Sequence, residues 1–457
     1  MNDTRELSKF IIEKNKVLKG SVYLQKQSEK AINKDAYMIE NMKYNLAFIE
    51  ALKKEPENNK EKLLEKFQQR FKNYRDDWNN QPLNCIKNNT LGEDLKNKKT
   101  VPLCIDIEVA AICDLACPFC FREFIVTPDK IIEDKFCYNL IDQAAEMNVP
   151  SIKFNWRGEP LLHPKIYEYI NYAKKKGILE TIINTNATNL TEENSKKLIQ
   201  SGLDLIIYSF DGGTKKTYEK MRPGRFKPNS FEKVYGNIKN FKKVRDKLNS
   251  KFPFTKIQMI LTKETIYEVD SFFNNFENYV DNVSCNQYTE RGGDISDLNN
   301  LEKSKYKNLL KKHKLPMNTP YMKDIEGNIS VSKGRLPCKQ PYQRLLVTYE
   351  GKVGMCCYDW GARHTIGYAS KTALNNLKDY SNISDSIKKN KKGFELLKNA
   401  KMPKDYNLPS KTIESLKEIW EGKEVDKVRE KHFKNQSEEI SICEKCTFKD
   451  VYNWSSE

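Results

Sequence analysis

The sequence predicts an α/β protein in which six strand–helix units form a parallel sheet, preceded by a helical region and followed by a small cysteine-rich domain. Two observations predict this organisation. Between residues 101 and 300, short apolar runs alternate with amphipathic segments of helical period, which is typical of a parallel sheet with helical crossovers. Before that range the periodicity is helical only, and after residue 330 five cysteines gather. We therefore expect three parts, with the bounds 1–100, 101–300 and 330–457.

The composition excludes some partners. The 457-residue chain is long enough for two or three domains, and its 79 basic and 62 acidic side chains give a net charge of +17. Its lysines are mixed with acids rather than gathered into one basic block with aromatics, so we expect no nucleic-acid partner. No apolar signal region begins the sequence, and no run approaches the ~18 apolar residues of a membrane span. We expect a cytoplasmic protein without a membrane partner, whose twelve cysteines serve metal or redox chemistry.

Residues 1–100 carry two apolar stripes at spacings of three and four residues, which predict amphipathic helices with one buried face. The stripes are Met38, Met42, Leu46, Ile49 and Leu52, and then Leu64, Phe67, Phe71, Tyr74 and Trp78. Both a packing cap on the main domain and a partner-docking module fit this pattern, and we favour the cap. Asn79–Pro82 and Asn88–Gly92 predict a linker, and Cys85 receives no role.

Six apolar segments predict the strands of the central part. They are Cys104–Ala110, Ser151–Trp156, Glu180–Asn184, Leu203–Phe210, Thr255–Leu261 and Asn282–Tyr288. Amphipathic segments such as Lys165–Lys175 and Glu192–Gln200 predict the helices between them. In parallel sheets the chemistry collects in the loops at the carboxyl ends of the strands. The loop after the first strand is therefore a candidate site.

That loop contains Cys113, Cys117 and Cys120, with the spacing C-x3-C-x2-C. Thiolates this close together, without a secretory signal, are metal ligands more often than disulfide partners. Four thiolates close a zinc or iron–sulfur centre, whereas three leave one position open for a substrate or cofactor. The alternative is a structural zinc knuckle that takes its fourth ligand from elsewhere in the chain.

With an aromatic residue, Phe119, before the last cysteine, this motif resembles the signature of the radical S-adenosylmethionine (SAM) enzymes. The resemblance implies a partial (β/α)6 barrel. It also implies that the three cysteines hold a [4Fe–4S] cluster, that the fourth iron binds SAM, and that Phe119 lies beside the adenine. An external electron donor such as flavodoxin or ferredoxin follows from the same resemblance.

Later segments are similar to further motifs of this family. Arg157-Gly158-Glu159-Pro160 follows the second strand and resembles Gly-Gly-Glu-Pro, which implies that Gly158 and Glu159 bind the SAM amino group. Arg157 stands where the family has its first glycine. His163, nearby, is either a proton-transfer group or a structural residue of the turn.

The ends of the third and fourth strands resemble the family as well. Asn184–Ala187 is similar to Thr-Asn-Gly with alanine for glycine. The resemblance further implies that Ser209 contacts SAM, while Asp211 and Arg222 shape the pocket or touch the SAM carboxylate. Cys285, on the sixth strand, is a candidate hydrogen donor to a substrate radical; the alternative is a buried, inert cysteine.

The C-terminal cysteines resemble the SPASM extension of radical SAM enzymes, which carries auxiliary iron–sulfur clusters. They are Cys338, Cys356, Cys357, Cys443 and Cys446. Four ligands would hold one auxiliary [4Fe–4S] cluster, and zinc is the alternative metal. Adjacent strand residues face opposite ways, so only one of Cys356 and Cys357 should be a ligand. We expect a hairpin turning at Glu350-Gly351 and surface helices in an insertion at about residues 368–411.

These resemblances predict a radical SAM enzyme of oxidoreductase or epimerase type. It would cleave SAM reductively and abstract a hydrogen atom from a C–H bond of a sugar or other small molecule. No winged-helix peptide-recognition module is evident in residues 1–100, which favours a small substrate. Two alternatives are a maturase acting on a ribosomally made peptide or protein, and a non-catalytic, zinc-stabilised binding protein on a degenerate barrel.

Overall fold

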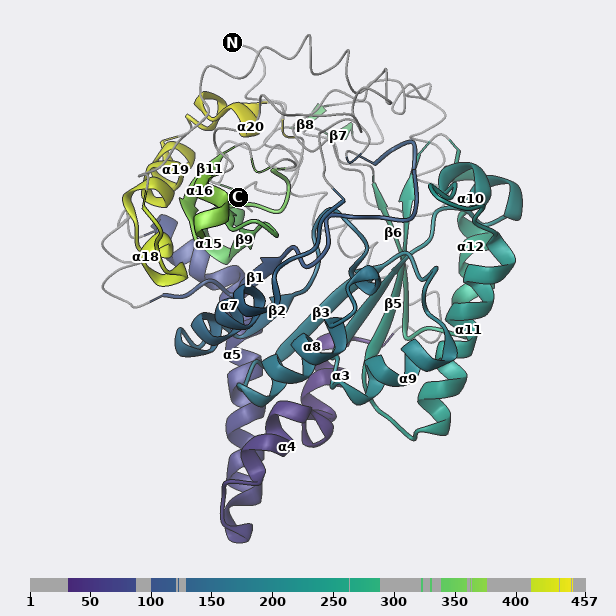
Figure 1. Ribbon diagram of the computed structural model, residues 1–457, viewed down its shortest axis with the longest axis horizontal. Coiled ribbons are helices and arrows are strands. Elements are labelled where there is room, and N and C mark those ends of the chain that lie inside the picture. Colours follow the sequence, from purple (N-terminus) through teal and green to yellow (C-terminus); the bar gives the residue numbers. More distant parts are fainter. Residues whose placement is uncertain are drawn as a thin grey trace.

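In the computed structural model, one large mixed sheet organises the chain (Figure 1). The residues described are 32–87, 100–120, 122, 129–262, 264–287, 322–323, 329–330, 338–359, 362, 364–375, 412–434, 436–444 and 446. Nine strands lie in the order β11-β10-β9-β1-β2-β3-β4-β5-β6, and β7 pairs with β8 separately. In the described part of the chain, no helix is long and apolar enough to cross a membrane.

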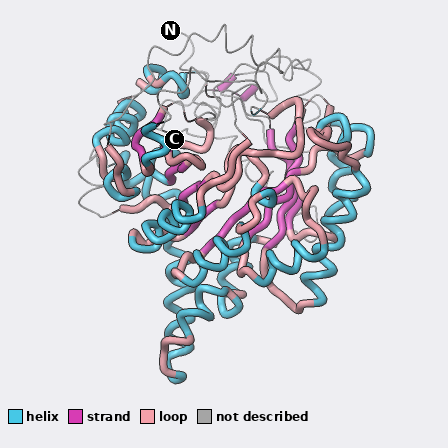
Figure 2. Tube along the Cα trace, in the orientation of Figure 1, coloured by secondary structure: helices cyan, strands magenta, loops and turns pink. Residues whose placement is uncertain are grey.

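The six predicted strands form the parallel half of the sheet, which confirms the predicted α/β class. They are β1 (Cys104–Ile107), β2 (Ser151–Lys153), β3 (Glu180–Thr185), β4 (Leu205–Ser209), β5 (Phe254–Leu261) and β6 (Asn282–Gln287). The helices between them are α7 (Asp134–Glu146), α8 (Ile166–Lys175), α9 (Glu192–Gln200), α10 (Lys215–Met221), α11 (Phe231–Lys247) and α12 (Val269–Phe276). Figure 2 shows the strands on the inside and these helices around them.

The two faces of this parallel half differ in polarity. The outer face packs on the helices, as Ile105 and Ile107 of β1 do on Leu140 and Ile141 of α7, and these contacts form the main apolar core. The opposite face, called the inward face below, carries the residues that alternate with this set, and Asp106 is one of them. Because strand side chains alternate between faces, the burial of one set sends the other inward.

Three N-terminal helices close the amino ends of the strands. They are α3 (Lys34–Glu40), α4 (Leu46–Leu52) and α5 (Lys60–Lys87). The Nζ atom of Lys34 lies 2.6 Å from Oε1 of Glu180 at the start of β3, and the hydroxyl of Tyr74 donates to Oε2 of the same carboxylate at 2.9 Å. An apolar cluster joins these helices to Leu103 and Leu179. The helices therefore pack as a cap on the sheet, as we favoured.

The expected linker at Asn79–Pro82 is wrong, because α5 continues through Pro82 to Lys87. Tertiary contacts support this stretch: the side-chain amide of Gln81 donates to the carbonyls of Val101 and Tyr342 at 3.2 and 2.6 Å. The second expected break, Asn88–Gly92, lies outside the described residues, and so does the side chain of Cys85.

The C-terminal part extends the same sheet. Its elements are β7 (Met322–Lys323), β8 (Ile329–Ser330), α15 (Gln340–Gln343), β9 (Arg344–Val347), β10 (Lys352–Gly354), β11 (Thr365–Tyr368), α16 (Lys371–Asn375), α18 (Leu416–Trp420), α19 (Lys423–Phe433) and α20 (Ser441–Glu444). The expected hairpin is confirmed, since β9 and β10 pair antiparallel and Gly351 has φ 102° in the turn. The sequence did not predict that β9 also pairs in parallel with β1. Residues 376–411 of the insertion lie outside the described residues.

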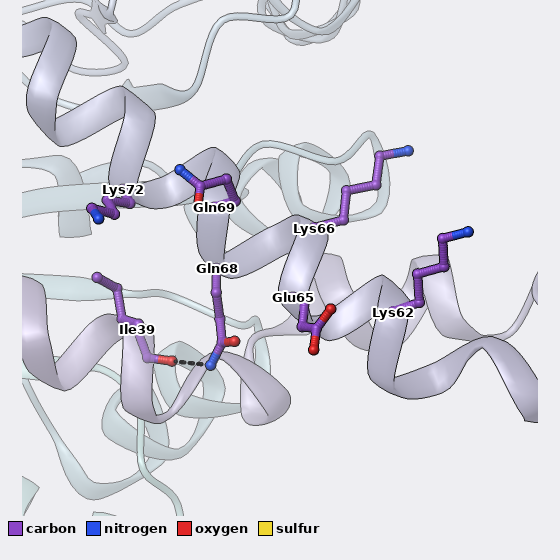
Figure 3. Close-up of a pocket in the computed structure, with 7 residues that line it drawn as sticks. All are labelled: Ile39, Lys62, Glu65, Lys66, Gln68, Gln69 and Lys72. Carbon is purple, nitrogen blue, oxygen red and sulfur yellow. Dashed lines mark hydrogen bonds between the residues drawn. The ribbon is translucent and has the colours of Figure 1, made fainter.

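A surface hollow along α5 lies on the N-terminal helices (Figure 3). The Gln68 amide, which lines this hollow, donates to the carbonyl of Ile39 at 3.0 Å. The exposed side chains of Lys62, Lys66 and Lys72 also line the hollow. None of the cysteines lines this hollow, and we assign it no function.

Candidate functional site

Cys113, Cys117 and Cys120 gather in a small cluster at the carboxyl end of β1, as the sequence predicted. They pack with Leu115, Phe119, Met221 and Ile260. The segment after α10 holds the loop in place: Ala116 N–H donates to the Pro223 carbonyl at 2.9 Å, and Arg225 N–H donates to the Asp114 carbonyl at 2.8 Å. Residues far apart in sequence thus fix the loop at this end of the sheet.

Cys117 is buried, and Cys113 and Cys120 are half-buried. Burial, and then the charge of Glu159, raise the pKa of Cys113 to about 12. Burial also raises the pKa of Cys117, although Arg222 opposes the rise. Closely spaced thiolates need a cation, and three thiols with no fourth cysteine beside them among the described residues fit a [4Fe–4S] cluster that keeps one iron open. Among the described residues, no three His, Cys, Asp or Glu side chains are arranged around a single metal ion.

Gly158 lets the loop after β2 approach the cysteine loop. A Cβ atom at Gly158 would lie 2.2 Å from the Ala110 carbonyl oxygen and 2.4 Å from that of Ile112. The N–H of Glu159 donates to the same Ile112 carbonyl at 2.9 Å. A side chain at residue 158 would therefore push these two loops apart. In this structure the glycine provides contact with the chain itself, whereas we expected it to contact SAM.

Glu159 is a buried carboxylate that points toward the cysteine loop. Its Oε1 accepts hydrogen bonds from Thr185 Oγ1 at 2.7 Å and Leu161 N–H at 3.1 Å, and its Oε2 accepts one from Asn186 N–H at 2.7 Å. Burial raises the pKa of Glu159 to about 7 despite these donors. No cation of the described chain pairs with it. An unpaired carboxylate beside Cys113 fits an incoming ammonium group, as the resemblance implies.

Asp114 is a site residue that the sequence reasoning missed, and Asn186 entered that reasoning only as part of the Asn184–Ala187 segment, without a role. The side-chain amide of Asn186 donates to Asp114 Oδ1 at 2.8 Å and lies 3.8 Å from Cys113 Sγ, while Thr188 Oγ1 donates to Asp114 Oδ2 at 2.5 Å. These bonds tie the end of β3 to the cysteine loop. The position of Asp114 inside the cysteine motif was the available signal. Ala187, which stands at the glycine of the family motif, takes the left-handed φ of 59°.

Asp211 and Arg222 pair with each other. Arg222 Nε donates to Asp211 Oδ2 at 2.7 Å, and the Ile260 N–H donates to Asp211 Oδ1 at 2.6 Å. The guanidinium of Arg222 lies 5.8 Å from the ring centroid of Phe119. The structure thus brings both residues to the cysteine cluster, with the arginine next to Phe119. Ser209 ends β4 on the inward face, in register with Gln258.

Arg157 has a partner that explains its presence in place of glycine. Its Nε and Nη2 atoms donate to the two carboxylate oxygens of Glu108 at 2.6 and 2.8 Å, and both side chains are buried. The guanidinium also lies 4.3 Å from the ring centroid of Trp156. The indole N–H of Trp156 donates to the carbonyl of Cys357 at 3.0 Å. This loop therefore contacts both sets of cysteines.

His163 and Cys285 lie in structural positions. His163 is 1% exposed, its Nδ1 accepts from Lys165 N–H at 3.1 Å, and burial lowers its pKa. Cys285 is in register with Met259 and packs in the main apolar core on the outer face. A hydrogen donor to a substrate inside the barrel would need the inward face, so the placement of Cys285 favours the inert alternative.

The structure distinguishes the two adjacent C-terminal cysteines. The pKa of Cys356 is raised, first by a hydrogen bond with Cys357 and then by burial and by the charges of Cys338 and Cys446. Cys356 therefore lies near two other candidate ligands. The Sγ atom of Cys357 instead lies 3.8 Å from Arg344 Nη1 and 3.9 Å from Gln340 Oε1. The geometry thus favours Cys356 as the ligand.

Cys443 lies in α20, and Cys446 lies just after it; both are buried. The Sγ atom of Cys443 lies 3.5 Å from Nε2 of the buried His432. Sequence reasoning did not single out His432, because a lone histidine on α19 gave no spacing signal. It contacts one of the candidate ligands of the auxiliary site.

The fold and these thiol sets define a class of iron–sulfur proteins with a SAM-type barrel. Comparison with family models agrees with this class: residues 107–273 match the radical SAM superfamily, and residues 338–447 match the iron–sulfur cluster-binding SPASM domain. The chain is a member of the radical SAM superfamily with a C-terminal SPASM domain. These domains imply a SAM-binding [4Fe–4S] cluster and auxiliary iron–sulfur chemistry.

Curated relatives match parts of the chain. The tungsten-containing aldehyde ferredoxin oxidoreductase cofactor-modifying protein of Pyrococcus furiosus is 30% identical over 106 residues, 23% of this chain and 30% of the relative. The AdoMet-dependent heme synthase of Methanosarcina barkeri is 28% identical, covering 38% of this chain and 46% of the relative. The mycofactocin maturase MftC of Mycolicibacterium smegmatis is 24% identical, covering 40% and 43%. The chain spans less than half the length of each of these relatives.

Solved structures are similar to this chain at lower sequence identity. BtrN in complex with AdoMet and 2-DOIA has a TM-score of 0.41 at 14% identity, covering 76% of this chain and 93% of BtrN. Streptococcus suis SuiB bound to the precursor peptide SuiA has a TM-score of 0.43 at 18% identity, covering 67% of each chain.

Proposed function

We propose that this protein is a radical SAM oxidoreductase or epimerase that acts on a C–H bond of a sugar or other small molecule. One observation supports the proposal most strongly. Cys113, Cys117 and Cys120 lie in one cluster, beside the unpaired carboxylate of Glu159 and the Asp211–Arg222 pair. These groups come from four different segments, so their meeting at one end of the sheet is not a consequence of local sequence.

Within this proposal, Cys113, Cys117 and Cys120 would hold the [4Fe–4S] cluster. Bound there with SAM, the cluster supplies reductive cleavage of SAM and abstraction of a hydrogen atom from a C–H bond. Flavodoxin or ferredoxin would supply the electron. Glu159 would bind the SAM ammonium, since a buried carboxylate gains most from a cation that enters with it.

The other residues of the chain would position and shield the reaction. Asp211 holds the guanidinium of Arg222 beside Phe119, where it would face SAM. Asn186 and Asp114 fix the cysteine loop against β3. The N-terminal helices close the amino end of the sheet and exclude water from that side. Ser209 and Gly158 would contact SAM through the ends of β4 and the loop after β2.

For the auxiliary cluster we propose Cys338, Cys356, Cys443 and Cys446 as ligands, in a C-terminal part that spans about residues 330–457. Cys357 would remain a free thiol facing Arg344. The N-terminal part, 1–100, would serve as the cap of a barrel spanning 101–300. Zinc remains the competing metal at the auxiliary site.

A second candidate function is maturation of a peptide, which the similarity to the mycofactocin maturase MftC supports. The two candidates differ in substrate and share the same cluster chemistry. Purified protein assayed with a peptide library and with sugar derivatives would separate them by which class of compound loses a hydrogen atom to the SAM-derived radical.

The first test is formation of 5′-deoxyadenosine from SAM by anaerobically purified, reconstituted protein with dithionite or flavodoxin as reductant. We expect product from the wild type and from Cys285→Ala, which is a matched cysteine control outside the cluster. We expect none from the triple variant Cys113→Ala, Cys117→Ala, Cys120→Ala. If the iron content is intact and no 5′-deoxyadenosine forms, the non-catalytic binding-protein alternative replaces our proposal.

A further inference from the structure

The inward face of β2–β6 carries more polar than apolar side chains among the described residues. Its polar side chains include Lys153, Asn155, Asn184, Ser209, Lys256, Gln258, Asn282 and Ser284, and its apolar ones are Ile182, Leu205, Ile207, Phe254 and Ile260. Parallel strands covered on both sides normally carry apolar residues on both faces. The outer face here is mainly apolar, whereas the inward face mixes polar and apolar side chains. A polar inward face is expected where the sheet contacts a polar ligand rather than a packed core.

Three acids on this face are already paired. Arg344 Nη1 donates to Asp106 Oδ2 at 2.9 Å, Arg157 pairs with Glu108 at 2.6 Å, and Lys34 pairs with Glu180 at 2.6 Å. Two lysines of the same face have no acidic partner among the described residues. In the described part of the chain, neither Lys153 nor Lys256 forms an ion pair. Among the described residues, these two lysines therefore have no counter-ion.

Lys256 is the more isolated of the two cations. It lies on β5 in register with Ile207 and Asn282, and it is partly buried. Burial, and then the charge of Lys34, lower the pKa of Lys256. The charge that acts on Lys256 is thus that of another lysine, and the two ammonium groups repel each other. An ammonium group in this setting is stabilised by an anion that enters the site.

Unsatisfied acceptors lie on the same face. Asn184 Oδ1 and Asp106 Oδ1 are buried, and the described chain provides no hydrogen-bond donor for either. Asn184 pairs in register with Ile207, which pairs with Lys256, so the acceptor and the cation share one level of the sheet. Buried acceptors without partners are costly, and hydroxyl groups of a ligand would satisfy them.

We infer that the substrate is a hydroxylated anion, a sugar acid or a sugar phosphate, whose carboxylate or phosphate binds Lys256 with Lys153 as the second cation, and whose hydroxyls donate to Asn184 and Asp106. This inference rests on the proposed function for the direction of the substrate, with its C–H bond toward the cysteine cluster. The anion site itself requires no cluster. A neutral sugar or a cationic peptide would leave the two lysines without a counter-ion.

Equilibrium binding to the full-length protein tests the inference with inorganic phosphate and gluconate as the anionic probes and glucose as the neutral control. We expect phosphate or gluconate to bind and glucose to bind at least tenfold more weakly. Lys256→Met should weaken anion binding by about 10- to 100-fold, since it removes a charge-assisted hydrogen bond. Lys256→Arg should restore much of it. Lys247→Met, an exposed lysine at the end of α11, should bind as the wild type does.

The preferred probe identifies the anion, with phosphate indicating a sugar phosphate and gluconate a sugar acid. Circular dichroism of each variant shows whether it is folded, and the arginine variant covers the case in which Lys256→Met does not fold. Absence of binding by both anions, or equal binding to wild type and to folded Lys256→Met, would overturn the inference. Formation of 5′-deoxyadenosine is measured separately: its loss with anion binding intact would count against the proposed function alone.

Discussion

The two cysteine sets of this protein are assembled in different ways. Cys113, Cys117 and Cys120 come from one loop of eight residues, and the ends of neighbouring strands hold that loop. The C-terminal set comes from segments more than one hundred residues apart, between Cys338 and Cys446. In the first set the cysteines are close before folding; in the second, the pairing of β9 with β1 and the packing of α19 and α20 must bring the cysteines together. The comparison teaches that one site is mainly a property of local sequence and the other a property of the fold.

The largest expected effect is loss of the first set. Cys113→Ala should abolish formation of 5′-deoxyadenosine and remove about four irons per chain, because a three-ligand cluster cannot spare a thiolate. Iron, sulfide and product assays measure this. The auxiliary cluster should remain, since its proposed ligands lie elsewhere. If the variant loses all its iron, the two sites are not independent and the comparison fails.

The next effect concerns the second set. Cys356→Ser should remove the auxiliary cluster, with about four irons lost per chain, whereas Cys357→Ser should keep it, because Cys357 faces Arg344 and Gln340. Electron paramagnetic resonance of the reduced proteins, with metal analysis, separates the two. Zinc in place of iron in the wild type would exclude the auxiliary cluster, and the reverse pattern of loss would make Cys357 the ligand.

The ion pair of Arg157 with Glu108 offers a stability test, because Arg157 lies in the loop after β2 that contacts both sets of cysteines. Arg157→Ala leaves Glu108 buried without its partner, and we expect a loss of about 3–5 kcal/mol in the free energy of unfolding. Chemical denaturation of the cluster-free protein measures it. The exposed pair of Lys242 with Asp246 is the control, since Lys242→Ala should cost less than about 1 kcal/mol. Similar losses in both variants would show that the Arg157 pair does not hold the loop between the two sets.

Glu159 gives the first set a pH dependence. Its folded-state pKa of about 7 lies above the ordinary value of 4.5, so burial favours the protonated form and its contribution to stability falls as pH rises from about 4.5 to 7. Relative to Glu159→Gln, the cluster-free wild type should lose about 3 kcal/mol between pH 4.5 and 8. Parallel unfolding curves at each pH measure this difference. A difference that stays constant with pH would mean that folding does not shift the pKa of Glu159.

The smallest effect is expected at Ala187, where a non-glycine residue adopts φ 59°. Ala187→Gly should raise the free energy of unfolding by about 0.5–1 kcal/mol, because the strain of the left-handed conformation is removed. Gly177, with φ 90° and open space around its Cβ position, is the control: Gly177→Ala should destabilise the chain. An Ala187→Gly variant less stable than wild type would show that the methyl group packs more favourably than the strain costs.

Much of the barrel could be predicted because its signals are local. The alternation of strands and helices is confirmed, and α9 has the predicted bounds, Glu192–Gln200. The errors fall where distant contacts compete with local preference. Pro82 and its neighbours read as a break, yet α5 continues because Gln81 is anchored to Val101 and Tyr342.

By itself, the sequence determined the spacing of the cysteines at Cys113–Cys120, the order of the strands along the chain and the hairpin turn at Gly351, since each depends on residues within a few positions of one another. The tertiary structure alone decided which residue partners which. It paired Arg157 with Glu108, turned Cys285 to the outer face and Lys256 to the inward face, and separated Cys356 from Cys357. The physical reason is that alternation along a strand makes two sets of side chains, while only the packing of helices on one face decides which set turns inward.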